Sequence, residues 1–144
     1  MRLQFLTSKS DDFEKVMSIR NTVFEMEQNA IESEEIDLYD KSDETIYLLI
    51  YDGENAVATG RIAFTSDGVK IGRIAVLKSQ RGKGTGALLV NALCEKCESL
   101  GYSEIYVDSQ LHAIPFYEKQ GFRLVSNEKI MDRGIVHLPM LKEV

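Results

Sequence analysis

The sequence predicts a mixed α/β domain, in which a mostly antiparallel sheet carries one parallel crossover and flanking helices. Apolar, β-branched and aromatic runs are separated by the short turn sequences "DGEN" and "TSDG", a pattern typical of an antiparallel meander. A helix-forming stretch then separates two further strand-like runs, which requires a crossover between parallel strands. The chain contains no repeat, low-complexity tract or linker, so we expect a single domain over residues 1–144.

The elements are expected in the following order. The alternation of residues 1–7 predicts a strand, and Ser10 and Asp11 give a start signal for a helix that runs to about Met26. A second helix passes through Leu88 and Leu100 and is stopped by Gly101. The remaining strands and one short helix are expected at 45–51, 56–64, 69–77, 103–109, 112–120 (the helix), 121–126 and 135–141.

Charge is distributed unevenly along the chain. The segment 25–44 is acidic and has no clean period, so we expect a turn, a short helix and a loop whose charges face solvent. Arg20 lies on the apolar face of the first helix, where a snorkelling rim residue is a commoner arrangement than a paired cation. The net charge of −6 argues against a broad nucleic-acid surface and is compatible with a cationic substrate.

The composition is ordinary for a globular protein, with 44% hydrophobic and 28% charged residues. No apolar run is long enough to cross a bilayer, and the N-terminus lacks a signal-peptide core, so we expect a cytoplasmic protein. Cys94 and Cys97 have C-x-x-C spacing but lie well inside a helix, where redox pairs are not activated. A zinc site would need two more ligands, and only His112 and His137 are present, so buried thiols and no metal are expected.

The stretch "QRGKGTGALL" at residues 80–89 places three glycines and two cations directly before a helix. Convergent backbone N–H groups at such a helix start bind phosphate. A Walker A loop is excluded because Lys83 is followed by Gly84 and not by Ser or Thr. The dinucleotide fingerprint is met nominally by Gly82, Gly84 and Ala87, but four residues separate it from the preceding strand and only one β-α-β unit follows.

A third pattern, Arg81-x-x-Gly84-x-Gly86, makes the chain resemble the GNAT superfamily of acyl-CoA-dependent N-acetyltransferases. The stretch "IGRIAVLKSQRGKGTGALL" looks like that family's central strand, pyrophosphate loop and helix. The stretch "SQLHAIPFYEKQGF" looks like its second signature, an alanine, then an aromatic-Tyr pair, then Gly-Phe. The overlap spans residues 45–125, and "VFEMEQ" and "IVHLPM" also resemble a subgroup of small bacterial members.

The resemblance implies the GNAT fold and a role for each motif. Amides from Gly82 to Ala87 would hold the pyrophosphate of acetyl-CoA, and the main chain of Ile74–Val76 would pair with its pantetheine arm as an added strand. Tyr117 would be the catalytic residue that protonates the departing thiolate. The residues implied at acetyl-CoA are Ile74, Ala75, Val76, Arg81, Gly82, Lys83, Gly84, Thr85, Gly86, Ala87 and Gln110.

The resemblance further implies an N-acetyltransferase in which an amine attacks acetyl-CoA directly in a ternary complex. The acceptor, a primary amine of a small molecule or peptide, is expected near flanks that the donor does not use: Glu27, Gln28, His112 and His137. The general base stays open between Glu27, Asp108, His112, His137 and a water chain. A CoA-binding regulatory module without turnover and a dinucleotide-binding domain are the alternatives, and exposed edge strands could pair two chains as a homodimer.

Overall fold

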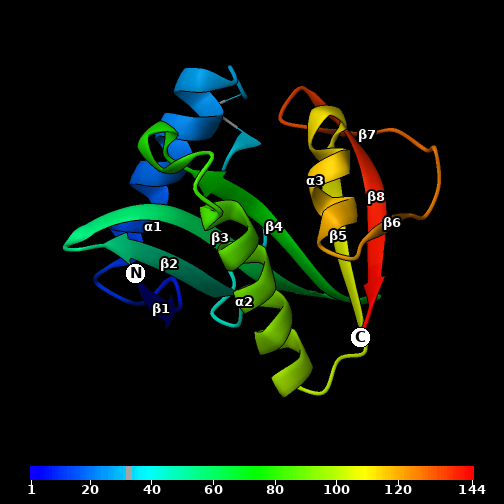
Figure 1. The fold of residues 1–144 in the computed structure, drawn as a ribbon, viewed down its shortest axis with the longest axis horizontal. Helices are drawn as coiled ribbons and strands as arrows, with labels where there is room; N and C mark the ends of the chain where they lie inside the picture. The colour runs from blue at the N-terminus through cyan, green and yellow to red at the C-terminus, as the bar shows by residue number, and fades with distance from the viewer. Residues whose placement is uncertain (32–33) are drawn as a thin grey trace.

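The computed structural model describes residues 1–31 and 34–144 and shows one mixed sheet with helices on both faces (Figure 1). The strand order is β1-β2-β3-β4-β5-β8-β6, and β7 also pairs with β8. The strands are β1 (Arg2–Leu6), β2 (Ile46–Asp52), β3 (Asn55–Thr65), β4 (Gly68–Val76), β5 (Glu104–Gln110), β6 (Arg123–Leu124), β7 (Ile130–Asp132) and β8 (Ile135–Glu143). The helices are α1 (Phe13–Arg20), η1 (Asn21–Glu27), η3 (Lys78–Gln80), α2 (Thr85–Ser99), η4 (Leu111–Ala113) and α3 (Ile114–Lys119). Within the described ranges, no helix is long and apolar enough to cross a membrane.

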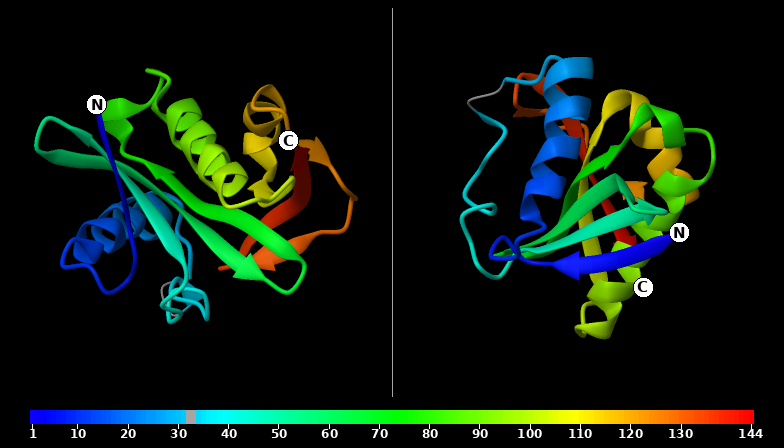
Figure 2. Two further views of the ribbon diagram at one scale, coloured as in Figure 1. Left: turned by 90° about the horizontal axis from the view of Figure 1, so that it is seen from below. Right: turned by 90° about the vertical axis from the view of Figure 1, so that its left-hand side faces the viewer.

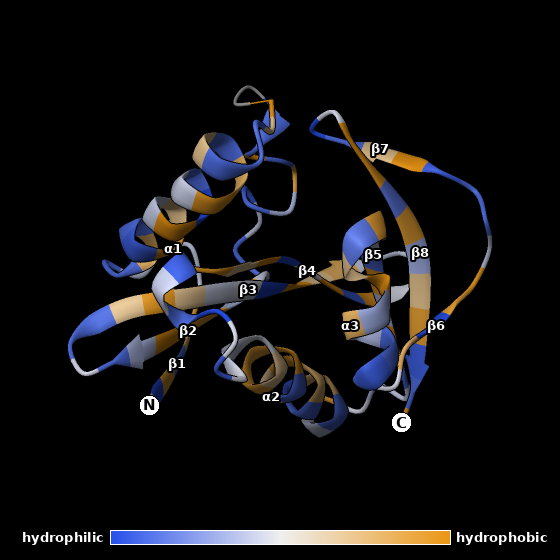
Figure 3. Cartoon of the chain, turned by 45° about the horizontal axis from the view of Figure 1, so that its top comes forward, coloured by the Kyte–Doolittle hydropathy of each residue, from blue (hydrophilic) through white to orange (hydrophobic). Residues whose placement is uncertain are grey.

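The two faces of the sheet carry separate hydrophobic cores. Successive side chains of β2 point to opposite faces, so Leu48 and Ile50 join the core under α2, whereas Tyr47, Leu49 and Tyr51 join the core under α1. Figure 2 shows α1 on one face and α2 with α3 on the other, and the central strands are mainly hydrophobic in Figure 3. Because β2 is buried on both faces, its sequence is a continuous apolar run and does not alternate between apolar and polar residues.

The predicted meander and crossover are both confirmed. Strands β2, β3 and β4 pair antiparallel in chain order, and β5 lies parallel to β4 after α2. In the part of the chain that the structure describes, the parallel pairing joins only Val69–Ile71 of β4 to Ile105–Val107 of β5. The two strands then diverge, as Figure 1 shows, and the sheet opens beside the carboxyl end of β4.

The first helix reaches its expected length but changes geometry on the way. It is α-helical as α1 and continues without a break as η1, which is a π-helix. Wider π-helical turns are frequent at functional sites. Phe24 of η1 and Gln28, the residue directly after η1, both line the cavity described below.

Strand β7 is missing from the sequence prediction. It forms because Arg133 and Gly134 both have positive φ, 55° and 78°. This backbone geometry suits a two-residue hairpin loop between twisted strands. Arg-Gly is not one of the dipeptides that mark such a loop in a sequence, and the three residues of β7 are too few to show alternation.

Two expectations about charge are wrong. Arg20 is no rim residue, because its side chain is fully buried and forms ion pairs with Glu35 and Asp40. Both acids belong to the segment 25–44, whose charges we expect from the sequence to face solvent, and both are buried. Residues 32–33 of that segment lie outside the described residues. A buried guanidinium persists here because opposite charges accompany it into the interior.

The two cysteines are buried thiols on α2, as predicted. Burial raises the pKa of Cys94 to about 11 and the pKa of Cys97 to about 12. A thiol at such a pKa is almost entirely protonated near neutral pH and is a poor nucleophile. The C-x-x-C spacing therefore reflects core packing.

Candidate acceptor and donor cavity

A cavity of about 390 Å³ lies where β4 and β5 diverge. One end reaches Arg81 and Gly86, at the start of α2, and the other reaches the hairpin of β7 and β8. The motif residues Ile74, Val76 and Tyr117 line the middle. The structure thus brings the loop, the strand and the second signature of the sequence to one cavity, although they come from separate parts of the chain.

The glycine loop forms a left-handed turn at the start of α2. Gly82 and Gly84 have φ values of 75° and 80°, which a residue with a side chain adopts only with strain, and Gly84 caps the helix. The first backbone N–H groups of a helix have no partner within it, so those of Thr85, Gly86 and Ala87 are available at this end. A phosphate group fits this arrangement of amides and helix dipole.

Gly86 packs closely against Phe116. A Cβ atom at this position would lie 3.4 Å from two ring carbons of Phe116, at the limit of ordinary van der Waals contact. The start of α2 thus lies against α3 at the cavity. Lys83 is exposed at the tip of the loop, outside the cavity lining.

Arg81 connects the loop to the first helix. Its Nη2 lies 2.6 Å from Oε1 of Glu27, and its Nε donates to the main-chain oxygen of Val76 at 3.0 Å. Glu27, which the resemblance implies at the acceptor, thus lies beside the glycine loop and forms an ion pair with Arg81. Gln28, the next residue, accepts a hydrogen bond from Nε2 of Gln110 at 2.8 Å, and both line the cavity.

Tyr117 is buried at the centre of the cavity wall. Only 6% of its surface is exposed, and its ring meets Phe116 and Phe122 edge to face, with centroids 5.1 and 5.8 Å away. Burial raises the pKa of its phenol well above the ordinary value. The hydroxyl therefore remains a proton donor throughout the physiological pH range.

His137 lies on β8 at the opposite end of the cavity and is 3% exposed. Its Nδ1 is 2.8 Å from the main-chain oxygen of Ile135. A carbonyl oxygen can only accept, so Nδ1 carries the proton in the neutral ring and Nε2 keeps its lone pair. Burial lowers the pKa of this imidazole, which favours the neutral form. His112, by contrast, is exposed on η4 at the cavity rim.

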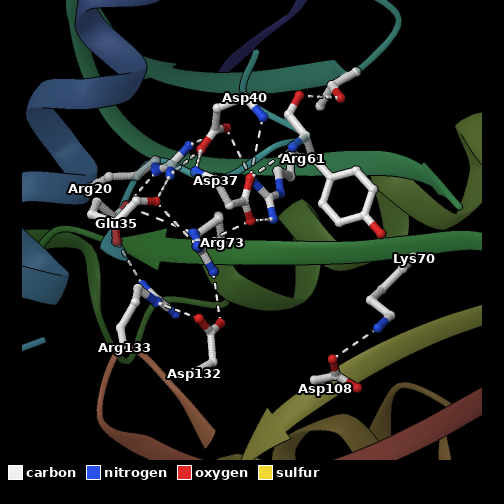
Figure 4. Close-up of polar contacts among 12 residues, drawn as sticks. Arg20, Glu35, Asp37, Asp40, Arg61, Lys70, Arg73, Asp108, Asp132 and Arg133 are labelled. Carbon is white, nitrogen blue, oxygen red and sulfur yellow. Dashed lines mark hydrogen bonds and ion pairs between the residues drawn. The ribbon is translucent and has the colours of Figure 1, made fainter. Parts of the chain in front are cut away.

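A buried network of ion pairs lies beside the cavity (Figure 4). Its members Arg61, Arg73, Asp132 and Arg133 line the cavity. Arg20 donates to Glu35 at 2.6 Å and to Asp40 at 2.9 Å. The other contacts involve Arg61 with Asp37 and Asp40, Arg73 with Asp37 and Asp132, and Arg133 with Glu35. The sequence analysis misses this network because the hydrogen-bonded pairs named here join residues 15 to 98 positions apart. Only Arg20 on an apolar helix face indicates it.

The network holds its acids in the ionised form. Burial alone would raise the pKa of Asp40, but the guanidiniums of Arg20 and Arg61 and the hydroxyl of Tyr47 outweigh it and keep that pKa well below its usual range. Burial together with the neighbouring cations Arg61 and Arg133 lowers the pKa of Arg73. The nearby carboxylates of Asp132 and Glu35 act in the opposite direction but do not outweigh these two effects.

Comparison with known proteins decides the family. Residues 13–144 match the family model described as an acetyltransferase (GNAT) domain. The chain belongs to the GNAT acetyltransferase family. This confirms the family and the fold that the two motifs imply.

Individual relatives of this GNAT chain agree with the assignment. It is 35% identical to the uncharacterized N-acetyltransferase YjcF of Bacillus subtilis over 96% of this chain and 97% of that protein. The crystal structure of Escherichia coli ElaA superposes with a TM-score of 0.85, at 28% identity and 99% coverage of both chains. The acyl-homoserine lactone synthase BjaI, a CoA-dependent enzyme whose structure contains SAM and isopentyl-CoA, shares the fold at 16% identity, with a TM-score of 0.79 over 99% of this chain and 82% of that one.

Proposed function

We propose that this GNAT chain transfers an acetyl group from acetyl-CoA to a primary amine of a small molecule or peptide. The observation that carries the proposal is the single cavity that joins the phosphate loop to Tyr117 and His137. A donor and an acceptor that meet in one cavity favour direct attack in a ternary complex over a relay through the protein. Buried thiols at Cys94 and Cys97 also speak against a cysteine relay.

The donor fits the loop end of the cavity. Its pyrophosphate would lie on the amides of Thr85, Gly86 and Ala87, and Arg81 would hold the loop in place through Val76. Its pantetheine arm would run along the edge of β4 beyond Ile71, where β5 no longer pairs with that strand. BjaI, a protein of the same fold, holds isopentyl-CoA in its structure.

We assign the two proton transfers to His137 and Tyr117, which line the same cavity. Nε2 of His137 would accept a proton from the acceptor amine, whose nitrogen forms a bond to the acetyl carbon as the carbon–sulfur bond breaks. The Tyr117 hydroxyl would donate a proton to the departing sulfur. The other candidate bases are less suited, because Glu27 is paired with Arg81, Asp108 is paired with Lys70 at 3.0 Å, and His112 is exposed.

The remaining assignments concern the whole chain. We propose one acetyltransferase domain over residues 1–144, in the cytoplasm, with no nucleic-acid, membrane or metal requirement. The net charge of −6 supports the absence of a nucleic-acid partner. A homodimer formed through an edge of the sheet stays a prediction, which sedimentation of the purified protein would test.

Release of free CoA thiol from acetyl-CoA across an amine library tests the proposed activity. The assay reads the product directly, because the two buried protein thiols react slowly with an aromatic disulfide reagent. Acetyl-CoA-dependent stabilisation together with thiol release would support the transferase. Stabilisation with no release for any amine would favour a CoA-binding regulatory module, and stabilisation by NAD in place of acetyl-CoA would favour the dinucleotide-binding alternative.

A further inference from the structure

We propose that the acceptor amine also carries a carboxylate, which binds to the guanidinium groups of Arg73 and Arg133, with Lys70 at the rim of the same site. This inference rests on the proposed transferase function and names its substrate class. It starts from the charges on the cavity wall: among the described residues, the lining has five basic members and two acidic ones. The chain as a whole has a net charge of −6, so its cavity is cationic inside an acidic protein.

The arrangement of the ion-pair network produces this polarity. The acids Glu35, Asp37 and Asp40 come from the segment between η1 and β2 and are absent from the cavity lining, whereas Arg73 and Arg133 belong to it. Glu35 and Asp37 pair with the guanidinium groups of Arg73 and Arg133 from outside the cavity, and the same two arginines also line the cavity. The lining also contains Asp132, which pairs with Arg73 at 2.8 Å and with Arg133 at 3.4 Å, and Asp108, which pairs with Lys70. Cationic groups still outnumber carboxylates on the cavity wall, which favours an anionic ligand group.

Some N–H donors of the described network have no hydrogen-bond partner. Among the described residues, the Nε atoms of Arg61, Arg73 and Arg133 are buried without a hydrogen-bond acceptor. Arg73 has a positive φ of 49°, a strained backbone for a residue with a side chain, and this directs its guanidinium to Asp132 at 2.8 Å on the cavity wall. The positive potential of Arg61 and Arg133 at Arg73 would be offset by an anion bound there.

The positions of the reacting groups fit a zwitterion. His137 lies on the same hairpin side of the cavity as Arg133, so an amine at His137 places a carboxylate a few bonds away within reach of the cations. A polyamine would bring a second positive charge against Arg73 and Arg133. An uncharged amine would leave those cations without a ligand partner.

Binding of the reaction product tests the site without relying on turnover. Isothermal calorimetry on the CoA-saturated protein would compare a set of N-acetyl amino acids with their primary amides, which differ only in the carboxylate. Charge-assisted hydrogen bonds predict roughly 10- to 100-fold tighter binding of the best acid than of its amide. The preference should shrink as salt is raised. Equal affinity of acids and amides across the set would overturn the proposal.

Variants locate the effect. Arg73→Gln should remove most of the preference for the acid, and Lys70→Gln, at a half-exposed position on the same strand, should reduce it even if Arg73→Gln fails to fold. Arg123→Gln makes the same change in charge at an exposed ion pair away from the cavity, so it should keep the full preference. An unchanged preference in both cavity variants, when folded, would refute the assignment.

The activity and the carboxylate site can fail separately. Thiol release that is faster with amino amides or polyamines than with amino acids would keep the transferase and overturn the carboxylate site. Selective binding of N-acetyl amino acids without thiol release for any amine would keep the site and overturn the transferase.

Discussion

The catalytic assignment of Tyr117 depends on one hydroxyl group in an aromatic cluster. Tyr117→Phe keeps the ring contacts with Phe116 and Phe122, so CoA affinity and the melting temperature should change little. Loss of a general acid should lower kcat by roughly 10²- to 10⁴-fold. Tyr102→Phe removes a hydroxyl from a tyrosine that packs on Phe64 and provides the control. A Tyr117→Phe enzyme with the parental kcat would make the residue a packing group only.

The pH dependence of kcat provides a separate reading of His137. The base must be neutral, and burial lowers the pKa of His137, so activity should fall only as the pH drops below its ordinary pKa near ~6.5. The same shift means that the contribution of His137 to stability is present above that pH and is lost as the pH falls. His137→Gln should abolish the acidic limb, whereas His112→Gln should leave its midpoint in place. An identical limb in His137→Gln would assign the base elsewhere.

Gly84 and Gly53 allow strain to be separated from ligand binding. Both have positive φ, 80° and 61°, and a Cβ atom at either would have no heavy atom within 4 Å among the described neighbours. Alanine at each position should therefore destabilise the fold by about 1–2 kcal/mol through backbone strain. Only Gly84→Ala should also weaken acetyl-CoA binding, because only Gly84 shapes the phosphate loop. Calorimetric titration of both variants with acetyl-CoA would measure the two affinities. Equal affinity of Gly84→Ala and Gly53→Ala for acetyl-CoA would mean that the glycine loop does not bind the donor.

The described residues between η1 and β2 form no regular strand or long helix, and buried ion pairs hold them to the rest of the fold. Arg20→Ala would leave Glu35 and Asp40 buried with fewer partners, and unfolding in urea should show a loss of about 3–5 kcal/mol. Arg123→Ala, which breaks an exposed ion pair, should cost less than about 1 kcal/mol. Similar losses for the two variants would mean that the buried pairs add little to holding the segment.

The same segment should determine the response to acid. Neighbouring guanidiniums outweigh burial and keep the pKa values of Asp37, Asp40 and Asp132 below the ordinary value of 3.8. Carboxyl groups whose pKa is lower in the folded state than in the unfolded state stabilise the fold above pH 3.8, and this stabilisation is lost as the pH falls below that value. The free energy of unfolding should therefore drop steeply below about pH 4. Arg20→Ala should flatten that drop.

Elements with a strong local pattern are the ones that the sequence predicts well. The meander, the crossover helix and the glycine loop each leave a signal within about a dozen neighbouring residues. The π-helical continuation of α1 and the Arg-Gly hairpin at β7 leave no such signal, because tertiary packing determines their backbone. Motif resemblance singles out Tyr117 and the glycine loop, and the structure shows Tyr117, Arg81 and Gly86 at one cavity. The buried ion-pair network is not predicted, because Arg20, Glu35 and Arg133 are far apart in the sequence and come together only in the folded chain.

At the scale of the whole molecule, the two cysteines report on unfolding. Cys94 and Cys97 lie in the core under α2, and their raised pKa values suppress the thiolate. A thiol reagent should label almost neither of them in the native protein and both in denaturant. Because labelling requires opening of the core, its rate should fall when acetyl-CoA stabilises the fold. Rapid native labelling would mean that α2 detaches locally.

The short parallel contact between β4 and β5 has a mechanical consequence. Within the described chain, only three residue pairs join β4 to β5. This short pairing connects the two halves of the sheet, β1–β4 and β5–β8. A donor arm that lies along β4 would cross-link the two halves where their own hydrogen bonds end. Amide hydrogen exchange should then slow in the strands on both sides of this contact when CoA binds, including in β8, which pairs with β5. Acetyl-CoA would thus stabilise the sheet across the β4–β5 contact as well as supply the acetyl group.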